Sequence, residues 1–450
     1  MQMKNLIWMR HRLKIIYFII AILSLTQCKH EQVTNKGAVY VLLSWNKLLL
    51  ELVQTSEGYR PPVSGRMYAY MGMAQWEINR QFLQSAISMQ SKFDELEITA
   101  WDPIYGKLIQ EVALNSCYDR MIHHFFPHAT MAMQKKVSDF KLSLRKQFLN
   151  EFDKFQLEQS EHYGIKIADE IFEFSKLDRV GHQAFAFNFD QDYIPAVGDG
   201  KWVSLDSMPA LLPHWGQAKW FLLPPDSIKL VPPIEFSNER SSEFFSQALE
   251  VFTISRPLTS ERRWIAEFWS DDFHGITFCA VSRWISILIQ YTEQNPNTVE
   301  VLVETLFRMG LALNDATVFV WSKKYIYNVE RPDTYIRRNV NKNWEPLHHT
   351  PNFPSYPSGH ATFGAAAGEV FKAMFGNKIQ FTDRSHETKK EFNGTPRKFT
   401  TIDAMVNENA LSRLYLGVHY RMDCEEGLNV GKIIGKKAVE LSLLKNQVKN

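Results

Sequence analysis

The chain has 450 residues, 45% of them hydrophobic and 22% charged. This is the composition of an ordinary globular protein, long enough for one large domain or for two or three smaller ones. The formal net charge of +2 indicates neither a nucleic-acid-binding surface nor an acidic tail.

The first 27 residues have the pattern of an export signal. Four Lys or Arg residues precede an apolar run over 15–25, which is too short to cross a bilayer because a helix needs about 20 residues to do so. Cys28 follows and resembles a bacterial lipoprotein cleavage site, although Gln27 stands where a small residue is usual. We expect residues 1–27 to be a signal peptide, Cys28 a lipid anchor, and the protein an exported periplasmic or cell-surface (outer-membrane) lipoprotein. The alternatives are a plain signal or a tethering helix.

Apolar residues recur at helical spacing along most of the remaining chain. The pattern predicts helices over 39–55, 66–88, 100–118, 131–176, from 241, from 259, over 281–291, 298–325 and 361–375. The helical pattern of 131–176 is amphipathic, typical of one or two outer helices with a solvated face. The remaining cysteines, Cys117, Cys279 and Cys424, show no CxxC spacing, so we expect buried apolar thiols.

Residues 187–235 interrupt this pattern with many Pro, Gly, Trp and Asp residues. Such composition predicts a loop with short strands, and its length favours a lid or rim over a linker. Because strand patterns are otherwise scarce, we predict an all-α fold, a helical bundle with two helical halves. We expect residues 37–235 to form an N-terminal helical region with this loop, and residues 236–445 to form a C-terminal catalytic helical region that carries the three segments described next.

The first of three chemically distinctive segments contains Lys324 and Arg331. Seven residues are about two helical turns, so on one helix both cations would point the same way. Pro332 is predicted to end that helix at Arg331. By itself this pair is weak evidence for a site, because such a pair is more often a solvated basic face.

The second segment is Pro357-Ser358-Gly359-His360. It has the pattern of a helix start with Ser358 at or near the N-cap, where free N–H groups and the helix dipole attract anions. Gly359 allows the backbone to approach a ligand, and His360 could exchange protons there. The alternative is a capped helix with an incidental histidine.

The third segment contains Ser412-Arg413, Gly417, His419 and Asp423. A break at Gly417 would let Arg413 and His419 reach one point. Asp423 could accept the Nδ1 proton of His419 and leave Nε2 as a nucleophile or metal ligand, unless the two form only a surface pair. Together the three segments supply the cations, donors and histidines that a tetrahedral oxyanion needs.

The motifs Lys-x6-Arg-Pro, Pro-Ser-Gly-His and Ser-Arg-x5-His-x3-Asp resemble, without substitution, those of the type 2 phosphatidic acid phosphatase and vanadium haloperoxidase superfamily. Trp321 and Phe353 resemble the vanadium chloroperoxidase type, in which a Phe at this position lies over the vanadate. The segments 66–69 and 268–271 resemble exported bacterial members of the haloperoxidase branch. Membrane lipid phosphatases differ by their several transmembrane helices, which this sequence lacks after residue 27.

The resemblance implies the helical bundle of the vanadium haloperoxidase and acid phosphatase type, and it implies a role for each residue. His419 would bond vanadium, Asp423 would orient His419, and His360 would be the acid–base group. The oxygens of vanadate would be held by Lys324, Arg331, Ser358, Gly359 and Arg413. Bound vanadate would act as a Lewis acid that activates hydrogen peroxide toward a halide.

Three functions stay open at this point. The first is a vanadium-dependent haloperoxidase-like enzyme, with hydrogen peroxide and a halide as substrates. The second is a soluble acid phosphatase, in which His419 would attack a phosphate ester and His360 would protonate the leaving oxygen. The third is an anion-binding, catalytically silent surface lipoprotein. Trp321 and Phe353 favour the first, unless they only pack around a basic pocket.

The expected partners are small molecules, with no nucleic acid and with membrane contact only through the lipid anchor. A homodimer is an open expectation. Two further groups could lie near the site: His348 and His349 at its rim, and Asp271, Asp272 and His274 as a counter-charge to Lys324 or as a second metal-ligand set.

Overall fold

The computed structural model describes residues 35–445 apart from 206–207, 272 and 274. The expected signal peptide over 1–27 and the anchor at Cys28 therefore lie outside the described residues. Within the described part of the chain, no helix is both long and apolar enough to cross a bilayer.

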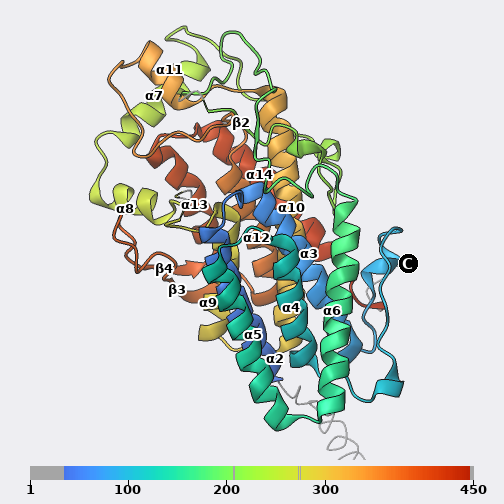
Figure 1. Cartoon of the computed structure of the whole chain (residues 1–450). Helices are drawn as coiled ribbons and strands as arrows, with labels where there is room; N and C mark the ends of the chain where they lie inside the picture. Colours follow the sequence, from blue (N-terminus) through green and yellow to red (C-terminus); the bar gives the residue numbers. More distant parts are fainter. Residues whose placement is uncertain (1–34, 206–207, 272, 274, 446–450) are drawn as a thin grey trace, which may run out of the picture.

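Helices dominate the structure, and the predicted all-α class is confirmed (Figure 1). The N-terminal helices are α2 (Lys36–Thr55), α3 (Pro61–Asn79), α4 (Gln110–Phe125), α5 (Met131–Glu151) and α6 (Lys154–Lys176). They are followed by α7 (Glu243–Ser255), α8 (Ser260–Phe268), α9 (Ala280–Gln294), α10 (Val299–Tyr327), α11 (Pro332–Asn339), α12 (Gly359–Phe375), α13 (Ile402–Leu416) and α14 (Arg421–Glu440).

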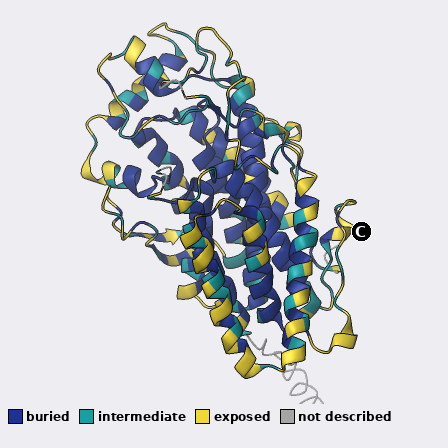
Figure 2. Cartoon of the chain, in the orientation of Figure 1, coloured by how far each residue is buried: buried dark blue, intermediate teal, exposed yellow. Residues whose placement is uncertain are grey.

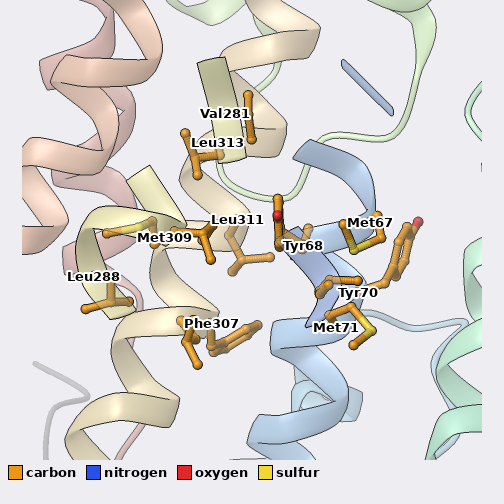
Figure 3. Close-up of a cluster of buried hydrophobic side chains, with 14 of the residues drawn as sticks. Met67, Tyr68, Tyr70, Met71, Val281, Leu288, Phe307, Met309, Leu311 and Leu313 are labelled. Atoms are coloured by element: carbon orange, nitrogen blue, oxygen red, sulfur yellow. The ribbon is translucent and has the colours of Figure 1, made fainter. Parts of the chain in front are cut away.

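The core lies between α3 and α10, which pack along one another, and α9 packs beside them (Figure 3). Helix α12 packs against α9 and α10. Every residue of α3 is buried, and so are most residues of α10. A helix that is buried all round belongs to the centre of a bundle. Helix α5 instead buries only Val137, Leu144 and Phe148, so it is an outer helix (Figure 2), as the amphipathic pattern predicted.

Two predicted helices have different limits in the structure. The helix predicted over 66–88 begins at Pro61 because proline suits the first turn, where its missing N–H costs nothing. It ends at Asn79. The helix predicted over 100–118 begins only at Gln110. A single 3-10 turn, Pro103–Tyr105, precedes it and is capped by the Asp102 side chain.

Two small antiparallel hairpins accompany the helices among the described residues. Strands β1 (Phe189–Asp190) and β2 (Ala210–Leu211) pair within the Pro- and Gly-rich loop. Strands β3 (Lys378–Asp383) and β4 (Arg397–Thr401) pair with Phe381 opposite Phe399. The sequence pattern did not predict the second hairpin. Its inward side chains, including Phe381 and Phe399, complete the core beside α9.

Candidate oxyanion site

The three distinctive segments meet where the end of α10, the start of α12, the end of α13 and the start of α14 come together. Glycines on α14 make this convergence possible. A Cβ atom at Gly427 would lie 2.8 Å from the Ser358 carbonyl oxygen, and one at Gly431 would lie 2.3 Å from the Thr362 carbonyl oxygen. Helices α12 and α14 therefore touch backbone to backbone, which brings the residues at their first turns together.

Lys324 and Arg331 do not lie on one helix, so that prediction was wrong. Helix α10 ends at Tyr327, because Asn328 takes the left-handed conformation and its N–H caps the Lys324 carbonyl. Pro332 is the first residue of α11 rather than a stop signal, and Arg331 is its N-cap. The backbone turns between the two residues and still directs both side chains to the same segment before α12.

Both cations are buried and are held by main-chain carbonyls. Lys324 Nζ donates to the oxygens of Pro354 (2.8 Å) and Ser355 (2.7 Å). Arg331 donates through Nε to Phe353 O (2.9 Å) and through Nη1 to Val418 O (2.7 Å). Burial, and then the neighbouring Arg331, hold the pKa of Lys324 well below its usual value. A bound anion would offset both effects.

Ser358 is the N-cap of α12, as predicted, but its side chain does not cap the helix. Its hydroxyl is buried, has the Cys424 thiol as a polar neighbour, and finds no acceptor of good geometry among the described residues. The Ser358 N–H is already used by Asp423 O at 2.9 Å. Gly359 and His360 follow in the first turn, where N–H groups have no partner within the helix.

His419 is oriented by a carboxylate, as its spacing to Asp423 predicted. Gly417 ends α13 in the left-handed conformation with φ 83°, and His419 then precedes the first turn of α14. His419 Nδ1 donates to Asp423 Oδ2 at 2.9 Å, and the Ser355 hydroxyl donates to the same oxygen at 2.5 Å. This bond leaves Nε2 as the nitrogen with a lone pair, and Arg331 Nη1 approaches it at 3.2 Å.

Burial and the cations around His419, first Arg331 and then Lys324, lower the pKa of its imidazole well below the usual value. The ring is therefore neutral near pH 7, the form in which imidazole bonds a metal. Burial raises the pKa of Asp423 to about 6.

His360 has a different environment. Arg413 Nη1 donates to its Nε2 at 3.2 Å, and Asp271 Oδ2 lies 4.0 Å from the same nitrogen. Arg413 is fixed by Ser412 Oγ (3.0 Å) and by the carbonyl of Trp269. Burial, and then Arg413, lower the pKa of His360 well below normal, while Asp271 opposes that shift.

Phe353 covers the two cations of the first segment. Its ring centre lies 5.1 Å from Lys324 Nζ and 5.0 Å from the Arg331 guanidinium carbon, and it packs against Trp321 with centroids 5.1 Å apart. The indole N–H of Trp321 donates to the Leu211 carbonyl at 3.1 Å. Strand β2 of the Pro- and Gly-rich loop therefore lies at the rim of the site.

The sequence also pointed to two groups of residues near the site, and the structure places the described ones in different surroundings. His348 and His349 line a pocket of about 130 Å³ together with Arg413 and Phe273. Asp271 faces His360 and is bound by Arg283, so it is not in ion-pair contact with Lys324. Asp272 and His274 lie outside the described residues, and the described residues contain no cluster of three or more His, Cys, Asp or Glu that could hold a metal ion.

The described geometry fits a tetrahedral oxyanion. The Ser358 hydroxyl lacks an acceptor, the Lys324 ammonium has acceptors for two of its three N–H groups among the described residues, and the His419 lone pair faces cations. Leaving such groups buried without a ligand costs free energy, whereas an oxyanion would satisfy all of them. Vanadate and phosphate share this shape and charge, so either one fits.

Sequence reasoning missed several residues that support the site. Ser355 lies two residues before the second segment and was given no role, although it donates to Asp423. Arg283 and His386 lie outside the three motifs and bind Asp271 only in the folded chain, and Asp383 in turn binds Arg283. No spacing in the sequence connects them.

Comparisons with known proteins agree with the motifs. Residues 304–446 match the family model described as the vanadium chloroperoxidase (VCPO) second helical-bundle domain. The chain is 26% identical over 165 residues to vanadium chloroperoxidase of Curvularia inaequalis and 32% identical over 104 residues to vanadium-dependent bromoperoxidase of Ascophyllum nodosum. These alignments cover 26% and 21% of this chain, and only 27% and 19% of the length of the two relatives.

Solved structures show the same fold over almost the whole chain. A bacterial vanadium-dependent iodoperoxidase matches with a TM-score of 0.80 at 24% identity, covering 91% of this chain and 97% of the other. A bacterial vanadium-dependent chloroperoxidase in its holo form matches with a TM-score of 0.66 at 16% identity, covering 87% and 94%. The three motifs lie within residues 304–446, so this part of the chain resembles the vanadium chloroperoxidase second helical-bundle domain, and the whole chain shares the fold of the solved vanadium-dependent haloperoxidases.

Proposed function

We propose that the protein is a vanadium-dependent haloperoxidase, which oxidises a halide with hydrogen peroxide. The observation that carries the proposal is the His419 Nε2 lone pair, held by Asp423 and facing the buried cations beneath Phe353. The relatives and structural neighbours named above are haloperoxidases, which supports this reading. When bound, vanadate would supply the Lewis acidity that activates peroxide.

The residues of this chain would divide the work between binding and proton transfer. Lys324, Arg331 and Arg413 would neutralise the oxyanion, and Ser358 and Gly359 would donate to its oxygens. His419 would be the protein ligand of the central atom, with Nδ1–H fixed on Asp423. His360 would hold or release a proton on the opposite side of the pocket, because Nε2 is the nitrogen that Arg413 and Asp271 face.

The test is one purified sample assayed with and without orthovanadate. We expect peroxide-dependent oxidation of iodide, bromide or chloride only after vanadate is added, and loss of that activity in His419→Ala. Leu411→Ala, a half-buried position on α13 with no part in the site, is the matched control for handling and folding.

Acid phosphatase activity is the outcome that would replace this proposal. Hydrolysis of a phosphate monoester that vanadate inhibits, with no oxidation of any halide, would assign the same pocket to phosphoryl transfer through His419. Absence of both reactions in a folded sample would leave oxyanion binding as the function.

We further propose that the protein is exported and lipid-anchored at Cys28. Metabolic labelling with a radioactive fatty acid should mark the wild type and not Cys28→Ala, and Cys117→Ala should stay labelled. Unlabelled wild-type protein would contradict the anchor.

A further inference from the structure

The β3–β4 hairpin carries a buried histidine that reaches the proton-transfer side of the site. His386 follows β3 in the loop that leads to β4, and its side chain is fully buried. Its Nε2 lies 2.9 Å from Asp271 Oδ1. Its Nδ1 is buried and has no hydrogen-bond partner among the described residues. Within the described part of the chain, the His386 imidazole therefore makes its hydrogen bond to Asp271.

The two oxygens of Asp271 have separate partners. Oδ1 accepts from His386 Nε2 and, at 3.1 Å, from Arg283 Nη1, whereas Oδ2 lies 4.0 Å from His360 Nε2. Since a carboxylate is planar, two donors on one oxygen fix the direction in which the other oxygen points. Here that direction is toward His360.

Arg283 is held in place by contacts that do not involve His386. A substitution at His386 can therefore be tested without displacing Arg283. The Arg283 guanidinium is fully buried, donates through Nε to Asp383 Oδ2 at 3.1 Å, and lies over the rings of Phe268 and Trp269. Asp383 is the last residue of β3, three positions before His386. The hairpin thus holds both donors that act on Asp271 Oδ1.

We infer that His386 is a positioning residue for His360: its N–H holds Asp271 so that the free carboxylate oxygen stabilises the protonated imidazole of His360. This inference rests on the proposed proton-transfer role of His360. It applies equally if the central atom is vanadium or phosphorus, because both chemistries require the same proton carrier.

Several charged groups among the described residues face His360 and influence its protonation. Arg413 of α13, Lys324 of α10 and Arg283 of α9 oppose the imidazolium, and Asp271 after α8 favours it. A change confined to His386 leaves all four in place. It removes one of the two donors that fix Asp271, so the imidazolium of His360 should become less stable.

The experiment is a titration of the histidine rings by NMR in the full-length, vanadate-free protein labelled with carbon-13 histidine. His360→Gln identifies the His360 signal by its loss. The test variant is His386→Phe, which keeps a ring between Phe278 and Phe392 but donates no hydrogen bond. His386→Gln restores an N–H donor, and Ser385→Ala is the control, because Ser385 lies in the same loop and binds Ser286 and Gln290 instead.

We expect the pKa of His360 to fall by about half a unit or more in His386→Phe, to recover in His386→Gln, and to stay unchanged in Ser385→Ala. In the active enzyme, turnover of His386→Phe should fall about 10-fold with little change in KM. An unchanged or raised pKa of His360 in a folded His386→Phe protein would overturn the inference.

The titration separates this inference from the proposed function. If the wild type has neither halide oxidation nor ester hydrolysis, the proposed function fails, while the NMR shift still shows whether His386 acts on His360. If the His386→Phe protein does not fold, His386→Leu takes its place in the titration. The same shift is expected there, and its absence would equally overturn the inference.

Discussion

The two histidines of the site each lie beside an aspartate, but the contacts differ in strength and geometry. His419 donates directly to Asp423 at 2.9 Å, and a second donor, Ser355, fixes that carboxylate. His360 lies 4.0 Å from Asp271 and instead accepts from Arg413. A direct bond fixes one tautomer and one ring orientation, as a ligand to a metal requires. The longer approach leaves Nε2 able to gain and lose a proton.

The difference predicts that the two sides of the pocket fail in different ways. Changes on the His419 side should remove oxyanion binding, and changes on the His360 side should slow turnover while the oxyanion still binds. Four predictions are given below in order of decreasing expected effect.

His419→Ala should lower vanadate-dependent halide oxidation by more than about 10⁴-fold, because it removes the protein ligand of the central atom. Equilibrium dialysis with vanadate should show parallel loss of tight binding. Tight binding that survives in the variant would break the comparison on this side.

His360→Ala should lower turnover by about 10²–10⁴-fold, the usual contribution of a positioned acid–base group. Vanadate affinity should change far less than in His419→Ala. Single-turnover kinetics and dialysis on the same sample measure both quantities. Equal loss of both quantities would mean that His360 acts mainly as a binding residue.

Asp423→Asn should weaken vanadate binding by about 10–100-fold, because an amide no longer fixes the Nδ1–H tautomer of His419. Asp271→Asn is the matched change on the other side, and we expect it to reduce turnover more than affinity. Reversed effects of these two variants would contradict the division of roles.

The smallest expected effect comes from substituting His348, and it concerns the pH dependence of the free energy of unfolding rather than activity. Burial, and then Arg413, lower its pKa to about 4. Between pH 6.5 and 4 the unfolded state therefore binds more protons than the folded state, so the free energy of unfolding falls as the pH falls. Urea unfolding at pH 7 and pH 5 should show a smaller loss in His348→Gln than in the wild type. Equal losses would show that His348 titrates normally.

The sequence predicted most of the candidate site, because its three motifs are short and each contains its own geometry. Ser358 at a helix start, Gly417 at a break and Asp423 four residues after His419 follow from local rules of capping and spacing. The all-α class followed from helical periodicity in the same way.

Long-range packing accounts for what the sequence did not predict. The spacing of Lys324 and Arg331 predicted one continuous helix, but the helix ends at Tyr327 because Asn328 takes the left-handed conformation. The pattern of apolar residues does not indicate such a cap. Asp271 was one candidate counter-charge for Lys324, but Arg283 and His386 hold it beside His360. Those partners come from a helix and a hairpin that are distant along the chain.

The crystal structure of the protein soaked with orthovanadate tests the central claim most directly. We predict one vanadium atom bonded to His419 Nε2, with its oxygens contacting Lys324, Arg331, Ser358, Gly359 and Arg413, and with His360 on the opposite side. Vanadate bound elsewhere, or bound in this pocket without a bond to His419, would contradict the account.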